Sequence, residues 1–310
     1  MPIKTLHSHR HHLGWDHSYP PALTVAPGDK LELELLDASG NRIQTTDTHE
    51  AVLNLAPENA NPLTGPIYVD GAELGDTLVI DILDFGLSDW GWTALIPEFG
   101  LLQEDFPDPF LHLSTYDETT VRFTDSVRLP TRPFAGTIGV APAQPGCHSA
   151  IPPTHCGGNI DIKSLVRGSQ LLLPVEVPGA LLSVGDGHAA QGDGEVCGTA
   201  IETRLSIQIR VDVIKAAQQT IPQPMALVPA VGYAEVSEGR SVMTTGIGPD
   251  LFTAAQDAVR FMIGLLSRRY GLEPELAYCL CGVAGDLRIS QLVNVPNWTV
   301  GFSMPEDVFF

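Results

Sequence analysis

Polar residues with the capacity for chemistry are concentrated in two glycine-rich segments between Thr154 and Glu202. The first segment carries His155, Cys156, Asn159, Asp161 and Lys163, and the second carries Asp186, His188, Gln191, Asp193 and Glu195. Glycine permits positive φ angles and close approach of the backbone. Imidazole, carboxylate and amide groups at this density among glycines favour a constructed site over a solvated loop.

The second segment predicts a metal site. Asp186 and His188 are two residues apart, and side chains at that spacing lie on one side of an extended chain. Gln191, Asp193 and Glu195 repeat the spacing, so a turn after His188 would bring both sets together. One imidazole with several carboxylates suits Zn²⁺ or a similar divalent ion, and a spare carboxylate can act as a general base. The alternative is a loop in which the carboxylates accept backbone hydrogen bonds.

Cys156 supports a different hypothesis. A thiolate beside an imidazole such as His155 can attack an acyl carbon. Cys197 lies in a strand-like run and is expected to be a core residue. Lys163 is either a substrate contact or a salt-bridged surface residue. The sequence contains no G-x-S-x-G elbow, P-loop or H-E-x-x-H motif.

Composition excludes several classes of protein. The chain has 37 acidic and 17 basic residues and a formal net charge of −20, which disfavours binding to nucleic acid. No apolar run approaches the ~18 residues of a membrane-spanning helix, and the polar start lacks the apolar core of a secretory signal. Five cysteines without a small-scaffold spacing favour reduced thiols and a cytoplasmic location.

Histidines outside the two segments form a second feature of the sequence. Five of the ten lie in the first twenty residues, where His7, His9 and His11 alternate and would share one face of an extended chain. This run is either a metal-binding element or a polar arm that packs on a neighbouring surface. His148 lies in a predicted turn that could face the central site.

Hydrophobic periodicity predicts a mainly β chain. Short strands are expected between residues 20 and 84, joined by turns in which Asp29 and Asp76 act as caps. Residues 85–135 read as irregular, and further strands are expected near residues 136–143, 203–215, 224–234 and 241–248. Helices are predicted at residues 249–270 and 274–283. No linker interrupts this pattern, so a single domain spanning residues 1–310, with a carboxy-terminal helical pair, is expected.

Several segments resemble the acetamidase/formamidase family. They are Asn61–Leu78, Gly139–Ala143, Gly157–Lys163, Leu173–Ala180, Gly185–Glu195 and Asp286–Val293. The resemblance runs from about residue 20 to the end and is most specific in Gly185–Glu195. It implies a β-sandwich-like core with added helices. It also implies hydrolysis of the C–N bond of small amides to a carboxylic acid and ammonia, and for some relatives of cyclic amides.

The resemblance assigns roles to individual residues. Asp161, His188, Asp193 and Glu195 match polar positions of the family motif, and Asn159 and Gln191 match its amides. A divalent metal, expected to be zinc, would be held by Asp161, Asp186, His188 and His155. Glu195 and Asp193 would be catalytic, with Glu195 as general base, and Asn159, Gln191 and Lys163 would bind substrate. Cys156 stands where relatives often have histidine, with His155 one position earlier.

Three alternatives remain open at this point. The substrate is a small linear amide of the formamide or acetamide type, or a lactam or other cyclic amide. Hydrolysis depends on metal, or on Cys156 as nucleophile. Otherwise the chain is a non-catalytic protein that binds a small molecule. A homodimer or higher homo-oligomer is expected, with no nucleic-acid or membrane partner.

Overall fold

Two β-sheets form the body of the molecule. The computed structural model describes residues 3–229 and 239–309. The larger sheet has nine strands in the order β1 (Lys4–Leu6), β4 (Lys30–Leu35), β15 (Leu205–Ile214), β6 (Thr77–Leu87), β13 (Gln170–Pro174), β16 (Met225–Pro229), β17 (Arg240–Gly248), β19 (Trp298–Pro305) and β18 (Asp286–Gln291). The first pair, β1 with β4, is parallel, and the later pairs are antiparallel.

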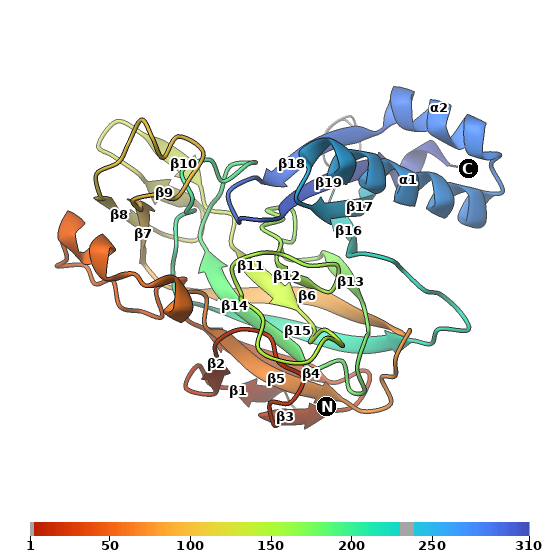
Figure 1. Cartoon of the computed structure of the whole chain (residues 1–310), viewed down its shortest axis with the longest axis horizontal. Coiled ribbons are helices and arrows are strands. Elements are labelled where there is room, and N and C mark those ends of the chain that lie inside the picture. Colours follow the sequence, from red (N-terminus) through yellow and green to blue (C-terminus); the bar gives the residue numbers. More distant parts are fainter. Residues whose placement is uncertain (1–2, 230–238, 310) are drawn as a thin grey trace.

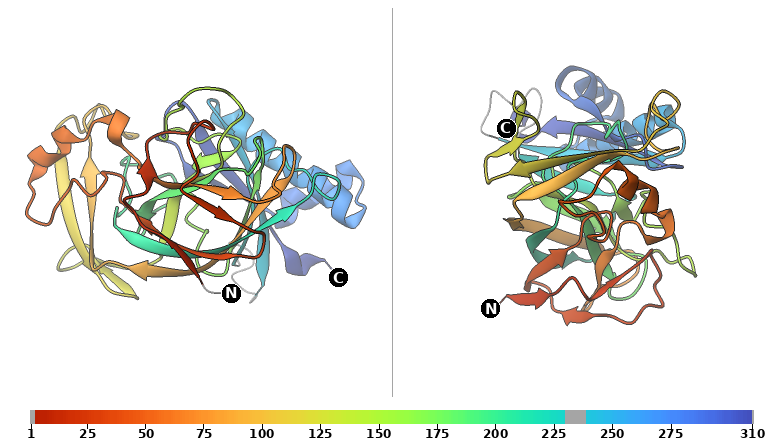
Figure 2. Two further views of the ribbon diagram at one scale, coloured as in Figure 1. Left: turned by 90° about the horizontal axis from the view of Figure 1, so that it is seen from below. Right: turned by 90° about the vertical axis from the view of Figure 1, so that its left-hand side faces the viewer.

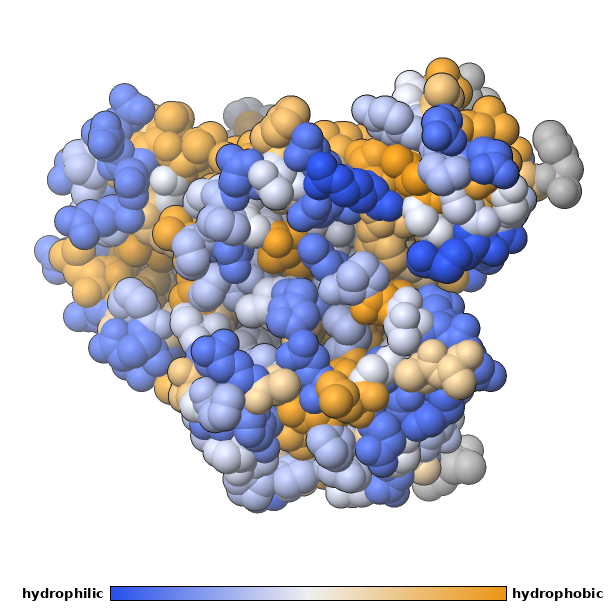
Figure 3. All heavy atoms as spheres, turned by 45° about the vertical axis from the view of Figure 1, so that its right-hand side comes forward, coloured by the Kyte–Doolittle hydropathy of each residue, from blue (hydrophilic) through white to orange (hydrophobic). Residues whose placement is uncertain are grey.

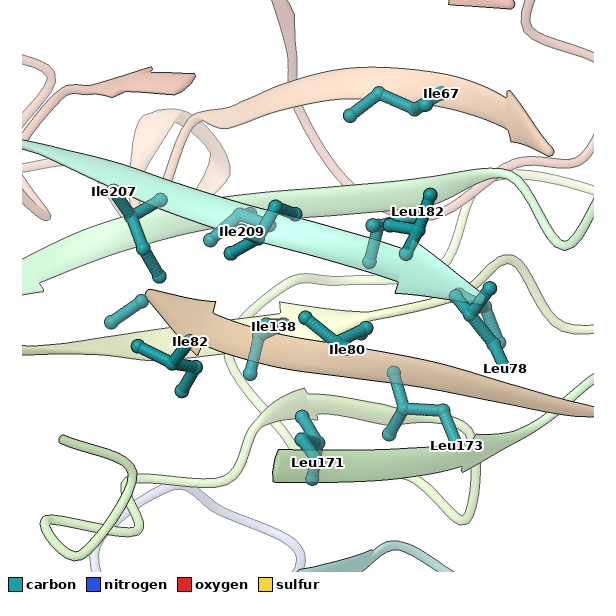
Figure 4. Packing of buried hydrophobic residues seen from close by; sticks show 14 of the residues in the cluster. Ile67, Leu78, Ile80, Ile82, Ile138, Leu171, Leu173, Leu182, Ile207 and Ile209 are labelled. Atoms are coloured by element: carbon teal, nitrogen blue, oxygen red, sulfur yellow. The ribbon is translucent and has the colours of Figure 1, made fainter. Parts of the chain in front are cut away.

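The second sheet packs against part of the first and closes a sandwich. It consists of β12 (Gly157–Asn159), β11 (Phe134–Gly139), β14 (Leu182–His188), β5 (Leu63–Val69) and β2 (His11–His12), and β3 (Leu23–Val25) pairs with β5. Alternate residues of β4 and β15 are buried, as period-2 patterns require. Figure 4 shows isoleucine and leucine side chains from both sheets meeting in this core. The predicted mainly β, sandwich-like fold is confirmed.

Residues 85–135 are a correction to the prediction of irregular structure. They contain a four-stranded sheet of β7 (Trp90–Leu95), β8 (Phe110–Tyr116), β9 (Thr120–Arg122) and β10 (Arg128–Pro130), seen at the upper left of Figure 1. Buried and exposed residues do not alternate regularly along β7, and β9 and β10 have three residues each. Without a clear period of two, their sequences carry little strand signal.

The predicted carboxy-terminal helical pair is also confirmed. Helix α1 (Leu251–Tyr270) and helix α2 (Pro274–Ala284) lie together over β17 and β19 (Figure 1). Asp250 caps α1 by accepting from the Thr253 N–H, and Gly271 ends the helix with a positive φ of 69°. Short 3₁₀ segments are η1 (His49–Asn54), η2 (Pro57–Asn59) and η4 (Glu306–Val308). The predicted strand at residues 224–234 is present to Pro229, and its remainder lies outside the described residues.

The amino-terminal arm packs on the sandwich, on the side away from the two helices (Figure 2). The chain turns after His7, so His7, His9 and His11 do not share a face of one strand. His7 pairs with Glu34 at 2.9 Å, and His12 contacts the Ser183 hydroxyl at 2.9 Å. These contacts match the interpretation as a polar arm on a neighbouring surface.

Three further expectations concern polar residues in turns and the surface. Asp29 and Asp76 accept backbone N–H groups in their turns, as predicted. His148 is partly exposed, its Nε2 contacts the Gln144 carbonyl oxygen at 3.0 Å, and it does not line the central cavity. Within residues 3–229 and 239–309, no helix has both the length and the apolar character needed to cross a bilayer. The face drawn in Figure 3 is mostly hydrophilic, with hydrophobic residues in separate patches.

Candidate active site

Four carboxylates surround one imidazole at the end of the sandwich. Asp186 and His188 end β14, Asp161 follows β12, and Glu202 precedes β15. His188 Nε2 lies 3.2 Å from Asp186 Oδ1 and 3.3 Å from Glu202 Oε1, and His188 Nδ1 lies 3.9 Å from Asp161 Oδ1. Glu195, from the following loop, completes the set, and all five residues are buried. We call Asp161, Asp186, His188, Glu195 and Glu202 the acidic cluster.

Gly136 of β11 makes room for the acidic cluster. A Cβ atom on this glycine would lie 2.6 Å from Asp161 Oδ1, 2.6 Å from His188 Cε1 and 2.7 Å from Asp186 Oδ2. Real Cβ atoms do not approach other atoms so closely. The absence of a side chain at Gly136 therefore allows three functional groups to converge over β11.

Backbone strain is concentrated at the same place. Asp161, Asp186 and Glu195 have positive φ angles of 49°, 61° and 47°, and neighbouring Asn61 has 50°. Residues other than glycine rarely adopt this conformation, which costs on the order of 1–3 kcal/mol where it is held. Three strained residues within one cluster indicate that these carboxylates are held in their orientation at a cost in stability.

Burial and mutual charge shift the pKa values of the cluster. Burial raises the pKa of Asp161 to about 7 and that of Glu202 to about 8, while the charge of His188 opposes both shifts. Burial, with the charge of Asp161, raises the pKa of Glu195 well above its usual value. Burial also disfavours charge on Asp186 and His188, but their attraction outweighs it. The charge of His188 lowers the pKa of Asp186. The charges of Glu202 and Asp186 raise the pKa of His188.

The acidic cluster fits a divalent cation. Asp161 Oδ1, Asp186 Oδ1, Glu202 Oε2 and both ring nitrogens of His188 are buried without a hydrogen-bond partner in the described part of the chain. Native proteins leave few such atoms unsatisfied. Asp161, Asp186 and His188 offer ligand atoms within 4.8 Å of one another, and so do His188, Glu195 and Glu202. An imidazole with carboxylates is a donor set that zinc and similar ions accept.

Amide and hydroxyl side chains hold the cluster from behind. Asn294 Nδ2 donates to Asp161 Oδ2 at 2.5 Å, and Asn61 Nδ2 donates to Asp186 Oδ2 at 3.4 Å. Thr137 donates to Asn159 Oδ1 at 2.7 Å. These contacts fix the carboxylates on one side and leave their other oxygen atoms free for a ligand.

A cavity of about 380 Å³ opens onto the cluster. Its floor is formed by polar residues, namely Asn61, Asn159, Asp186, Glu195, Glu202 and Asn294. Its walls include Trp92 and the following loop at Ile96–Phe99. Part of the segment at residues 85–135 therefore contributes to the wall of this cavity. A small molecule in this cavity would have its polar end against the cluster.

The predicted site residues fall into two groups. Asp161, Asp186, His188 and Glu195 come together, and Asn159 lines the same cavity. Gln191 contacts the backbone of the cluster, because its Nε2 donates to the Asp161 carbonyl oxygen at 3.2 Å. The expectation that residues 191, 193 and 195 point to one side is wrong, because the chain turns at residue 193 and is not extended.

Asp193, Lys163 and His155 lie apart from the cluster. Asp193 Oδ2 pairs with Lys163 at 2.9 Å and with Arg288 at 3.4 Å, all partly exposed. His155 pairs with Glu176 at 2.6 Å and lies 3.5 Å from Cys156 Sγ. The structure thus groups His155 with Cys156 and Glu176 rather than with Asp161.

Glu202, Asn294, Asn61 and Thr137 were not identified from the sequence. Glu202 lies seven positions after Glu195, and apolar residues stand between them, so it is separated from the polar residues of the second segment. Its backbone pairs with His188 across the chain, a contact that no local spacing reveals. Asn294 follows β18 in the chain and reaches the cluster through its contact with Asp161.

Comparisons with known proteins agree along the whole chain. The model of the acetamidase/formamidase family matches residues 3–150 and 143–310. A formamidase of Methylophilus methylotrophus is 29% identical over 96% of this chain and 89% of its own length. An acetamidase of Mycolicibacterium smegmatis is 30% identical over 67% of each chain.

Solved structures show the same relationship. The acetamidase of Bacillus halodurans superimposes with a TM-score of 0.89 at 32% identity, covering 98% of both chains. A gamma lactamase from Delftia acidovorans gives a TM-score of 0.68 at 28% identity, covering 97% of this chain and 89% of its own. The chain therefore belongs to the acetamidase/formamidase family and is an amidohydrolase that acts on carbon–nitrogen bonds other than peptide bonds.

Proposed function

We propose that this chain hydrolyses a small linear amide to a carboxylic acid and ammonia with the help of a divalent cation. The observation that carries this proposal is the buried acidic cluster with its unpaired ligand atoms at the floor of the cavity. Formamidase and acetamidase are the names of its relatives, so formamide and acetamide are the first substrates to test.

Asp161, Asp186 and His188 are the residues that would hold the cation, with Glu202 beside Asp186 at His188 Nε2. Zinc is the expected ion for this donor set. When bound, a divalent ion would polarise a carbonyl group and lower the pKa of water. An unactivated amide needs both effects for hydrolysis. His155 is not in this ligand set, because it pairs with Glu176.

Glu195 is the proposed proton carrier. It lines the cavity, and burial together with the charge of Asp161 raises the pKa of its carboxyl, which makes it a stronger base than an ordinary glutamate. It would accept a proton from the attacking water and deliver it to the leaving nitrogen, since an amide nitrogen departs only when protonated. Asn159 uses one N–H of its amide for the Ile151 carbonyl at 3.0 Å, and its other N–H remains for the substrate oxygen.

The other predicted residues support the site from outside the cavity. Gln191 holds the Asp161 backbone, and the ion pair of Lys163 with Asp193 ties the two glycine-rich segments together. We assign them positioning roles rather than contact with substrate.

The cysteine-dependent alternative is not favoured. Burial, with the nearby charge of Glu176, raises the pKa of Cys156 far above that of a free thiol. A thiol with a raised pKa is a poor nucleophile at neutral pH. The linear amide is preferred over a lactam because the acetamidase structure is the closer match of the two compared, at a TM-score of 0.89 against 0.68. The five free cysteines suit the proposed reducing, cytoplasmic environment.

Elemental analysis joined to activity measurement tests this function. Purified protein is expected to contain about one divalent ion per chain and to release ammonia from formamide or acetamide. Chelation should abolish release, zinc should restore it, and thiol alkylation should leave it intact. Ammonia release that survives chelation and is lost on alkylation would instead establish the Cys156 route. Protein that binds metal but releases ammonia from no amide would indicate a binding role.

A further inference from the structure

The cavity above the acidic cluster is larger than a formyl or acetyl group requires. Its volume is about 380 Å³. Formamide has three non-hydrogen atoms and fills on the order of 100 Å³ if each is given the ~30 Å³ share of a water molecule. Pockets of about 300–1,000 Å³ are typical of sites that enclose larger small molecules. Most of the cavity must therefore hold either water or a further part of the substrate.

The walls of the remaining space are apolar. They are formed by Leu55, Trp92, Ile96, Phe99, Ile151 and Val295. Trp92 is buried, and its indole N–H donates to Asp37 Oδ2 at 3.1 Å, so no polar atom of this ring is left for a ligand. Contact of such a surface with apolar groups is favourable, whereas its contact with water is not.

Two polar residues in the same walls, Thr199 and Arg42, already make hydrogen bonds within the protein. The Thr199 hydroxyl donates to the Ala94 carbonyl and accepts from the Ala94 N–H. Arg42 directs its guanidinium N–H groups at three backbone carbonyls. Exposed Glu98 adds a carboxylate to the lining, which opposes an anionic ligand. Polar groups of a substrate would thus find partners at the floor, around the acidic cluster, rather than along these walls.

Resting on the function proposed above, we propose that the preferred substrate is a neutral primary amide whose acyl group is apolar and larger than acetyl. At ~30 Å³ for each atom, the space beyond the amide accommodates up to about nine further non-hydrogen atoms. The amide lies against the acidic cluster and Asn159. The acyl chain or ring lies against Trp92, Ile96 and Phe99.

A homologous series of substrates tests this inference. We expect kcat/KM for ammonia release to rise from acetamide through butyramide to hexanamide by about two- to fourfold for each methylene, since each buried methylene contributes about fourfold at full burial. Benzamide should also exceed acetamide. A value for hexanamide equal to or below that for acetamide would overturn the inference and leave the amidase function standing. Failure of every amide in metal-replete protein would overturn both.

Two leucines near the end of η1, one inside it at Leu53 and one directly after it at Leu55, provide a matched comparison. Leu55 lines the cavity, whereas Leu53 is 61% exposed and does not. Leu55→Ala should lower the ratio of kcat/KM for hexanamide to that for acetamide by about fivefold or more, because part of the apolar wall is lost. Leu53→Ala should leave this ratio within twofold. Equal ratios in both variants would show that the wall at Leu55 does not contact the acyl group.

Discussion

At the scale of single residues, Glu195 and Asp193 separate two parts of the predicted motif. Both are acidic and two positions apart, yet Glu195 is buried in the cavity floor and Asp193 lies in ion pairs with Lys163 and Arg288. Glu195→Gln removes the proposed proton carrier and should lower kcat by about 10²–10⁴-fold. Asp193→Asn breaks only partly exposed ion pairs and should lower it by less than tenfold. Steady-state ammonia release, with metal content measured in parallel, distinguishes these outcomes; a larger loss in Asp193→Asn would restore that residue as catalytic.

Gly136 offers a test of the cluster that does not remove a ligand. Gly136→Ala would place a methyl group 2.6 Å from Asp161 Oδ1 and His188 Cε1, so the ligand atoms would have to separate. We expect metal content to fall below half of the wild-type value, with a stability loss of about 1–3 kcal/mol. Gly192→Ala is the matched control, because no atom lies within 4 Å of the added carbon. Full metal binding by Gly136→Ala would mean that the cation does not lie among Asp161, Asp186 and His188.

The sequence predicted the part of the site that depends on local spacing. Asp186 and His188 are two residues apart on one strand, and their side chains do approach, at 3.2 Å. Glu202, Asn294 and Asn61 join the site through pairing between distant segments, which no local pattern encodes. The orientation of Asp193 was predicted wrongly, because a spacing of two residues places side chains on one side only where the chain is extended.

At the scale of elements, helix α1 illustrates why the helices were predicted correctly and the small sheet was not. The apolar stripe of α1 repeats at helical spacing over twenty residues, from Leu251 to Tyr270, and both ends carry capping residues. Strands β9 and β10 have three residues each, too few to establish a period. Long elements with a regular hydrophobic pattern could therefore be predicted from the sequence. The short strands are defined by pairing with their neighbours and could not.

Helix α1 also supplies a prediction about packing. Met262 is fully buried in the cluster that joins α1 to the nine-stranded sheet, whereas Phe252 on the same helix is 73% exposed. Met262→Ala should reduce the free energy of unfolding by about 2–5 kcal/mol through the cavity it leaves. Phe252→Ala should change it by no more than about 0.5 kcal/mol. Equilibrium denaturation measures both, and a large effect of Phe252→Ala would reveal that this ring is covered in solution, as by a second copy of the chain.

At the scale of the whole molecule, binding of the cation and folding should be linked. The acidic cluster draws on segments far apart in sequence, from Asp161 to Glu202, with Asn61 and Asn294 behind them. Its four carboxylates face one imidazole in a buried site, and burial together with this crowding raises the pKa of Asp161, Glu195 and Glu202. A cation that binds this folded arrangement and not the unfolded chain stabilises the protein by mass action.

This linkage predicts the response of the protein to metal removal. Chelation should lower the midpoint of thermal unfolding, and zinc at about 100-fold its dissociation constant should restore about 2.7 kcal/mol, or roughly 5 °C or more. In a Gly136→Ala variant the same zinc addition should restore less than half of that shift, while the Gly192→Ala control should respond as the wild type does. Because the readout is stability, the result is independent of which amide the enzyme prefers. An identical midpoint with and without zinc, in protein that elemental analysis shows to be metal-free and metal-loaded, would place the bound ion outside the folded cluster.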